Sequence, residues 1–279
     1  MTTPPEIPDP TQASRAVLLD VLTILGLYLD GIVIIGGWVP ELIFPGRGHI
    51  GSLDVDLALD ERRIRSDGYN SIRQRLLDHG YLQSDLHAGV FHKRLPGKQG
   101  SVTVKLDLVT GQPPHEASPA LIQDLHIGRL RGIELALDHT DTITLDGELP
   151  SGVRNAVSAR VAAVPSFLCT KAFALSERKK PKDAYDVYFC LRHFAGGPRS
   201  LAQACGPLLP RPRGAQAMDI LAEKFATLNS IGPRWAAEVA SAQGDDPDTI
   251  ARDAFERAAV FLHTLKSIRT PHPPTGNQP

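Results

Sequence analysis

Two aspartates and a serine stand at a spacing that could place them around a metal ion. Ser52, Asp54 and Asp56 alternate along one short segment, and alternate residues of a β-strand lie on the same face. Neighbouring carboxylates on a half-buried strand repel each other and are costly to remove from water. A cation between them would relieve this repulsion, and a divalent metal ion is the simplest candidate.

A third aspartate has the same kind of setting. Between residues 102 and 108 the even positions are apolar and the odd positions are polar, with Lys105 and Asp107 among the latter. This alternation predicts a strand with one buried face. Carboxylate oxygens suit Mg²⁺ or Mn²⁺, so we expect Asp54, Asp56 and Asp107 to hold one of these ions. The alternative is that Asp107 only solvates the end of a strand.

A pair of glycines follows a buried strand. Residues 32–35 are β-branched and apolar, which is typical of a strand covered on both faces. Gly36 and Gly37 come next, and residues 38–44 are predicted to form a short helix. Backbone N–H groups at such a turn can approach a phosphate, so Gly36 and Gly37 are candidate phosphate-binding residues. The alternative is that the two glycines only make a tight turn.

A second charged group lies in a predicted helix further along the chain. Lys171, Ala174 and Arg178 are spaced so that they share one helical face. Two cations separated by a small residue predict an anion-binding surface. A second helix then carries Asp183 and Asp186, and acidic residues there also complement a helix dipole, which is the alternative explanation for Asp183.

The order of predicted elements divides the 279 residues into two parts. Strand-like segments alternate with helices up to a composition change near Pro165, after which the chain is helical. We therefore predict an α+β fold with one domain over residues 12–163 and a helical domain over residues 164–268. Within the first domain, residues 132–137 and 142–145 are predicted to form a hairpin.

The composition indicates an ordinary soluble protein. A formal net charge of −1 argues against wholesale coating of nucleic acid. The three cysteines suit a reducing cytoplasm and are expected as core thiols. The N-terminal residues lack the features of a signal peptide, and the apolar run over residues 21–29 is too short to span a bilayer. A cytoplasmic location without membrane association is expected.

In their order and spacing, these motifs resemble the nucleotidyltransferase superfamily and, within it, the AbiEii-type toxins of toxin–antitoxin and phage-defence systems. The resemblance covers most of residues 30–195. It is carried by Gly36-Gly37, Ser52-x-Asp54-x-Asp56, Asp107, Lys171-x-x-Ala174-x-x-x-Arg178 and Lys182-Asp183-x-x-Asp186. It implies a polymerase-β-like nucleotidyltransferase lobe with a mixed sheet, a helical C-terminal lobe, and an active site between them.

The resemblance also implies an activity and roles for residues. A toxin of this kind would transfer NMP from an NTP to an acceptor hydroxyl, on RNA such as a tRNA 3′ end or on protein. MenT-type relatives are similar and modify tRNA acceptor ends, and other AbiEii members are described as GTP-binding. A cognate antitoxin would be a partner.

The implied site has two groups of residues. The catalytic residues would be Asp54, Asp56, Asp107, Lys171 and Asp186, the three aspartates of the first lobe also holding Mg²⁺ or Mn²⁺. The nucleotide would be bound by Gly36, Gly37, Ser52, Lys171 and Arg178, with Asp186 orienting Lys171 or contacting the base or ribose.

One position departs from the family pattern. Many members have arginine two residues before the serine, where this chain has Ile50, and Arg47 or His49 could compensate. Two other functions stay open at this point. The same fold could nucleotidylate a small molecule such as an aminoglycoside, or it could be a non-catalytic protein that holds RNA or a partner with the basic residues of 62–75 and 179–182.

Overall fold

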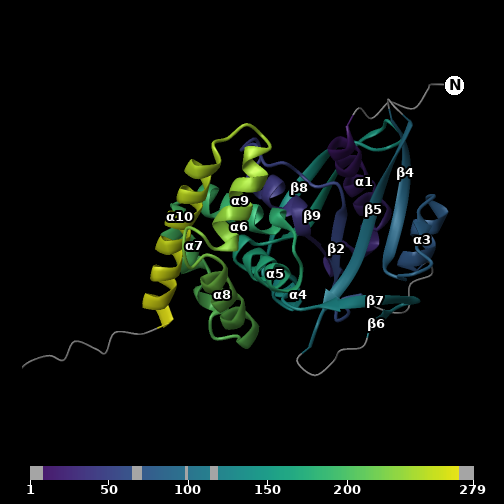
Figure 1. Cartoon of the computed structure of the whole chain (residues 1–279). Coiled ribbons are helices and arrows are strands. Elements are labelled where there is room, and N and C mark those ends of the chain that lie inside the picture. Colours follow the sequence, from purple (N-terminus) through teal and green to yellow (C-terminus); the bar gives the residue numbers. More distant parts are fainter. Residues whose placement is uncertain (1–8, 65–70, 98–99, 114–118, 270–279) are drawn as a thin grey trace, which may run out of the picture. The chain divides into compact units, whose positions relative to one another are not determined.

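The chain forms two compact units, each built from different elements. A computed structural model describes residues 9–64, 71–97, 100–113 and 119–269. The first unit ends at Ala163 and is called the strand unit below; the second begins at Val164 and is called the helical unit. Strands and helices together in one unit, and helices alone in the other, confirm the predicted α+β fold (Figure 1).

The strand unit is organised on a mixed β-sheet with the strand order β3-β4-β5-β2-β1-β9-β8. Its members are β1 (Ile32–Ile35), β2 (Val55–Leu59), β3 (Leu82–Gln83), β4 (Val90–Gly97), β5 (Gly100–Gly111), β8 (Thr140–Glu148) and β9 (Arg154–Ala162). Strand β2 runs antiparallel to β1 and parallel to β5. Two further strands, β6 (Ala120–Ile122) and β7 (Leu125–Leu130), join the sheet through pairing of β7 with β5.

Helices cover this sheet and fix the segment that follows β1. They are α1 (Pro10–Ile24), α2 (Val39–Ile43), α3 (Ile72–Asp78) and α4 (Ile133–Asp138). Helix α1 packs against β5, β8 and β9. The indole Nε1 of Trp38, just before α2, donates a 3.0 Å hydrogen bond to Ser14 Oγ of α1, and both side chains are buried. This hydrogen bond therefore connects the turn after β1 to helix α1.

The predicted hairpin over residues 132–145 is wrong. Residues Ile133–Asp138 form helix α4. The residue just before this helix, Gly132, has a left-handed backbone conformation. Strand β8 pairs instead with β9, antiparallel from Thr140↔Ala162 to Glu148↔Arg154. A short apolar run is compatible with either a strand or a buried helical turn, and pairing with a more distant segment decides between them.

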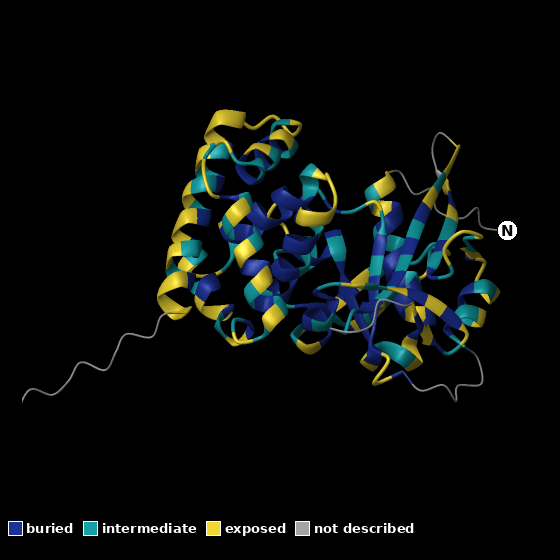
Figure 2. Cartoon of the chain, turned by 60° about the horizontal axis from the view of Figure 1, so that its bottom comes forward, coloured by how far each residue is buried: buried dark blue, intermediate teal, exposed yellow. Residues whose placement is uncertain are grey.

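The helical unit packs around one central helix. Its members are α5 (Val164–Glu177), α6 (Pro181–His193), α7 (Gly197–Ala204), α8 (Pro212–Lys224), α9 (Ile231–Ser241) and α10 (Pro247–Arg269). Helix α6 contacts α5, α7, α9 and α10. Every residue from Asp183 to Leu191 is buried, including two aspartates. Figure 2 shows the buried residues, in dark blue, gathered inside each unit. A helix buried on all sides must neutralise its charged side chains internally.

Two further expectations concern cysteines and membranes. The three cysteines are free thiols, and all of them are buried. Within the described ranges, no helix combines the length and apolarity that crossing a bilayer would require.

Candidate functional site

The strand unit places two carboxylates on one face of adjacent strands, and a third lies just before one of these strands. Asp56 of β2 lies directly opposite Asp107 of β5 in the parallel pairing register. Directly paired residues project their side chains to the same face of the sheet. Asp54 precedes β2 by one residue, at the alternate position to Asp56, and all three side chains are partly exposed. Asp54, Asp56 and Asp107 are called the acidic site below.

A lysine contacts one carboxylate of the acidic site. The Lys105 Nζ lies 2.6 Å from Asp107 Oδ2, and the two side chains are 40% and 22% exposed. Burial disfavours the charged ammonium, but the hydrogen bond that it donates to Asp107 and the charges of Asp107, Asp54 and Asp56 outweigh it and raise the pKa of Lys105. The cation that the paired carboxylates require is therefore supplied, in this structure, by the chain itself.

The donors of the acidic site fit a divalent ion in their chemistry. Three carboxylates from two neighbouring strands are the hard oxygen ligands that Mg²⁺ and Mn²⁺ prefer, and they already hold one cation, Lys105. As the side chains stand, no group of three or more His, Cys, Asp or Glu residues in the described ranges is arranged to hold a metal ion. The predicted metal role of Asp54, Asp56 and Asp107 stays a prediction.

Gly36 is shaped by its contact with Asp56. Ile35, the last residue of β1, pairs with Asp56, so Gly36 is the residue that follows this pair. A Cβ on Gly36 would lie 2.0 Å from Asp56 Oδ2, and the residue has a φ of +70°. Both facts require glycine. Gly37 is buried in the 3₁₀ turn Gly36–Trp38 that follows.

The loop before β2 is held by a histidine. His49 is buried, and its Nδ1 accepts a 3.1 Å hydrogen bond from the Gly51 N–H. This bond fixes the backbone immediately before Ser52, which is partly exposed. Arg47 is exposed and lies further from the motif in sequence. Of the two residues considered as substitutes for the missing arginine at Ile50, His49 thus has an observed role in shaping this loop.

The helical unit contains a second, buried group of charges. Lys171 of α5 places its Nζ 2.8 Å from Asp183 Oδ1 and 2.7 Å from Asp186 Oδ2, both on α6. The side chains are 7%, 1% and 0% exposed. Burial works against the charged Lys171, but Asp186 and Asp183 outweigh it and raise the pKa of Lys171. These three residues, with Arg178 and Lys182, are called the buried ion network.

Two further cations complete the buried ion network. The guanidinium of Arg178 binds both oxygens of Asp183, at 2.8 and 2.9 Å. The Lys182 Nζ lies 3.0 Å from Asp186 Oδ1 within the same helix. Lys171 and Arg178 therefore converge on one aspartate, with the Lys171 side chain 7% and the Arg178 side chain 53% exposed. Their predicted contacts with nucleotide stay predictions.

A family comparison bears directly on these motifs. The model of the family described as "Nucleotidyl transferase AbiEii toxin, Type IV TA system" matches residues 52–260, well over half of the chain. This chain belongs to the AbiEii nucleotidyl transferase toxin family. The match begins at the serine of the acidic motif and extends through most of the helical unit.

Comparison with individual proteins adds little to the AbiEii assignment. No curated protein matches the sequence. Among solved structures, JHP933 from Helicobacter pylori is 14% identical, with 90% of this chain and 94% of that chain covered and a TM-score of 0.40. A candidate nucleotidyltransferase from H. pylori is 15% identical, with 92% and 99% covered and a TM-score of 0.40. Neither likeness carries a functional argument at that score.

Sequence reasoning gave too little weight to two charged residues of this AbiEii chain. Lys105 shares a strand face with Asp107, so the alternation that selected the aspartate also places this lysine on the polar face. Asp183 was equally well explained by a helix dipole, yet it binds both Lys171 and Arg178. The signal in both cases was an opposite charge at a spacing that secondary structure brings close.

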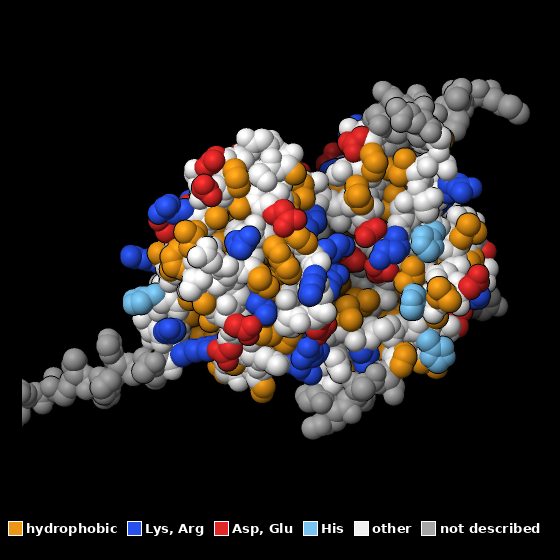
Figure 3. Space-filling model, in the orientation of Figure 1, with side chains coloured by type: hydrophobic (Ala, Val, Ile, Leu, Met, Phe, Trp, Pro, Cys, Tyr) orange, Lys and Arg blue, Asp and Glu red, His pale blue; other side chains and the backbone are white. Residues whose placement is uncertain are grey.

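Two arginines of the basic segment over residues 62–75 are paired with carboxylates. Arg62 and Arg63 both contact the buried carboxylate of Asp60, and Arg62 also contacts Asp138. Residues 65–70 of the same segment lie outside the described residues. On the face shown in Figure 3, basic side chains lie beside acidic ones on each unit. Arg62 and Arg63 are thus paired within the strand unit.

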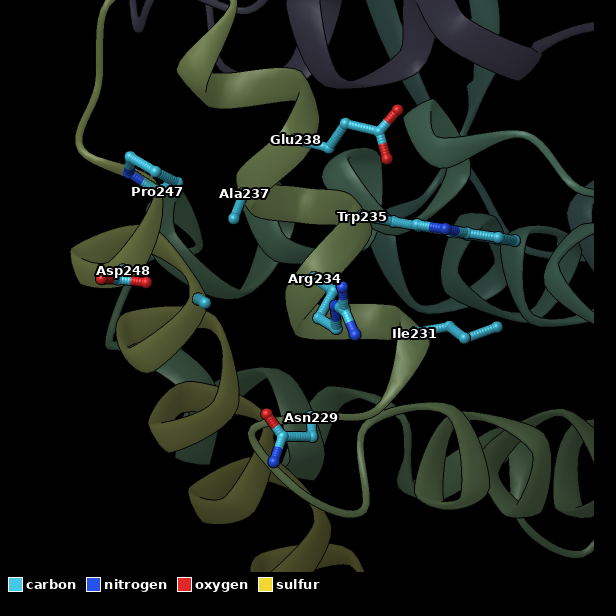
Figure 4. Close-up of a pocket in the computed structure, with 9 residues that line it drawn as sticks. Asn229, Ile231, Arg234, Trp235, Ala237, Glu238, Pro247 and Asp248 are labelled. Atoms are coloured by element: carbon cyan, nitrogen blue, oxygen red, sulfur yellow. The ribbon is translucent and has the colours of Figure 1, made fainter.

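The helical unit contains a pocket whose lining residues differ from the predicted site residues. It has a volume of about 580 Å³ and is bordered by α9 and the start of α10, with Arg234, Trp235, Glu238 and Asp248 among its residues (Figure 4). None of the residues predicted for nucleotide or metal lines it. Its mixture of acidic and basic groups does not single out a ligand.

Proposed function

We propose that this AbiEii-family chain transfers NMP from an NTP to a hydroxyl of RNA, with a tRNA 3′ end as the first acceptor to test. The observation that carries the proposal is the direct pairing of Asp56 with Asp107, together with Asp54 beside them. Like-charged side chains placed close together are an arrangement that enzymes use at active sites.

The acidic site supplies the charges for this reaction. Asp54, Asp56 and Asp107 would hold a divalent ion, which when bound neutralises phosphate charge and favours departure of pyrophosphate. The Ser52 hydroxyl and the backbone N–H groups at Gly36 and Gly37 would bind phosphate oxygens. Gly36 also leaves the space that the Asp56 carboxylate occupies.

The transfer itself needs no covalent enzyme intermediate. The acceptor oxygen forms a bond to the α-phosphorus, and the bond from that phosphorus to the oxygen bridging to the β-phosphate breaks. Pyrophosphate leaves with the electron pair, and Asp107 takes the proton of the attacking hydroxyl. Positioning and charge neutralisation supply most of the catalysis in such transfers.

Replacing one carboxylate of the acidic site tests the proposal. With Mg²⁺ or Mn²⁺, each of the four labelled NTPs and total tRNA, we expect Asp56→Asn to lower NMP incorporation by about 10²–10³-fold or more. Asp141→Asn is the matched control, because Asp141 is an exposed aspartate on β8 of the same unit. Incorporation by Asp56→Asn at the level of the control would refute the proposal.

The class of acceptor is identified by testing different candidate acceptors with the wild-type chain. Label entering tRNA supports the RNA acceptor, whereas label entering only a protein extract or only an aminoglycoside would replace it with one of those classes. Calorimetry with Mg²⁺ and each NTP identifies a non-catalytic protein by the absence of metal-dependent nucleotide binding. The family description also motivates an antitoxin as partner, to be sought as a protein that suppresses the transfer.

A further inference from the structure

Lys105 contacts one of the carboxylates to which a divalent ion would bind. Its Nζ is 2.6 Å from Asp107 Oδ2, and Asp107 pairs directly with Asp56 between β5 and β2. A metal ion coordinated by Asp107 would lie about 2.0–2.6 Å from a carboxylate oxygen. An ammonium and a divalent cation on the same carboxylate would then lie within a few ångströms of each other, where two positive charges repel strongly.

We propose that Lys105 is an internal counter-cation that pairs with Asp107 when no metal is bound and competes with the divalent ion for the acidic site. This inference rests on the proposed metal role of Asp54, Asp56 and Asp107. It adds that the metal enters by exchange, because repulsion between the two cations drives the ammonium away from Asp107.

The surroundings of Lys105 allow such an exchange. Its side chain is 40% exposed, and a lysine carries its charge on a flexible four-carbon stem. The ammonium can therefore swing toward solvent without unfolding β5. The contrast with Lys171 is informative, because that lysine is 7% exposed and is held by two aspartates of a buried helix.

The competition also explains why the carboxylates can lie together without metal. Three neighbouring carboxylates repel one another, and one ammonium offsets part of that repulsion. A divalent ion offsets more, so it can replace the lysine. Lys105 would then lower the metal affinity while keeping the strands β2 and β5 stable in its absence.

Direct measurement of metal binding tests the exchange. We compare Lys105→Met, which keeps the length of the side chain without its charge, with Lys105→Arg, which keeps the charge. The control is Lys224→Met, which removes a charge from a surface pair with Glu223 in the helical unit. Binding of Mn²⁺ alone is followed by calorimetry or by electron paramagnetic resonance, without nucleotide or acceptor.

The expected result is a lower Kd for Mn²⁺ in Lys105→Met, by about tenfold because partly exposed charges interact weakly. Lys105→Arg and Lys224→Met should stay near the wild type. In chelator, Lys105→Met should also unfold at a lower temperature than Lys224→Met, and Mn²⁺ should raise its unfolding temperature more than that of the wild type. The thermal comparison keeps the test informative if Lys105→Met yields little protein.

Two other outcomes would overturn the inference in different ways. If Lys105→Met binds Mn²⁺ no more tightly than wild type, while Asp56→Asn loses Mn²⁺ binding, the exchange is refuted and the metal-dependent function stands. If neither the wild type nor Lys105→Met binds Mn²⁺, the exchange and the metal role of the acidic site are refuted together.

Discussion

The acidic site and the buried ion network are both built from aspartates and basic residues. Carboxylates are in excess in the acidic site, whereas cations are in excess in the buried ion network. In the strand unit, three carboxylates share Lys105, and the contacting side chains are substantially exposed. In the helical unit, Asp183 and Asp186 are surrounded by Lys171, Lys182 and Arg178, with both aspartates fully buried. One cluster is short of positive charge and open to solvent, whereas the other has more cations than carboxylates.

This difference sets how costly it is to disturb each cluster. A buried pair with every partner in place is costly to disturb, because removing one member leaves a charge without its counter-ion in a poorly solvated interior. A partly exposed cluster of like charges can exchange its counter-ion with solvent at little cost. We therefore expect mutations in the two clusters to have different consequences for stability and activity.

The largest effect on stability is expected in the buried ion network. Asp186→Asn should lower the free energy of unfolding of the helical unit by about 3 kcal/mol, because Lys171 and Lys182 then lose a buried counter-charge. Asp54→Asn should change the stability of the strand unit by no more than about 0.5 kcal/mol, since it removes one of three repelling carboxylates.

Tryptophan fluorescence during urea unfolding can measure these effects unit by unit. The chain has two tryptophans, Trp38 in the strand unit and Trp235 in the helical unit. In a Trp38→Phe background, Trp235 reports the unfolding of the helical unit and so the effect of Asp186→Asn. In a Trp235→Phe background, Trp38 reports the unfolding of the strand unit and so the effect of Asp54→Asn. Equal destabilisation by the two aspartate replacements would remove the distinction between the clusters.

A smaller effect is expected at the glycine that makes room for the acidic site. Gly36→Ala and Gly46→Ala both place a side chain at a φ near +70°, but a Cβ meets Asp56 only at Gly36 and open space at Gly46. The backbone strain is shared, at about 1–2 kcal/mol. Overpacking against Asp56 should cost Gly36→Ala at least about 1 kcal/mol more, and should also lower nucleotide transfer.

Urea unfolding and transfer assays on this pair check the steric argument. Because the two alanine variants share the strain of a left-handed residue, their difference reports the contact with Asp56 alone. Similar stability and similar activity in both would show that the Asp56 carboxylate moves aside without consequence, and that Gly36 is needed only for its backbone conformation.

The smallest effect is a pH dependence of the buried ion network. Burial disfavours the Asp183 carboxylate, but the charge of Lys171 and hydrogen bonds from Arg178 and Lys171 outweigh it and lower its pKa below 3.8. The folded helical unit then binds fewer protons than the unfolded chain, so this contribution is present above pH 3.8 and is lost as pH falls through the lowered pKa.

Lys171, the ion-pair partner of Asp183, contributes to a pH dependence at high pH. The raised pKa of Lys171 gives a contribution that is complete below 10.5 and is lost only as pH rises through the raised value. The unfolding temperature of Asp183→Asn, followed through Trp235 between pH 7 and pH 2, should therefore approach that of the parent as pH falls. A constant difference across this range would contradict the assigned ion pairing.

Local patterns in the sequence were enough to predict several features of this protein. The alternation around Asp107 predicted a strand with one polar face, and β5 buries the even positions 104, 106 and 108 while Lys105 and Asp107 stay partly exposed. The helical character after Pro165 is confirmed by α5 to α10. Motif order predicted the AbiEii family, which the family match confirms. Each of these depends on residues close together in the chain.

Contacts between distant segments could not be predicted in the same way. The register that sets Asp56 against Asp107, and the pairing of β8 with β9 that displaced a predicted hairpin, depend on which strands meet in the sheet. Backbone periodicity assigns a side chain to a face, but it does not say which opposite charge will lie there. For that reason the sequence indicated that the aspartates needed a cation, and only the tertiary structure identified it as Lys105.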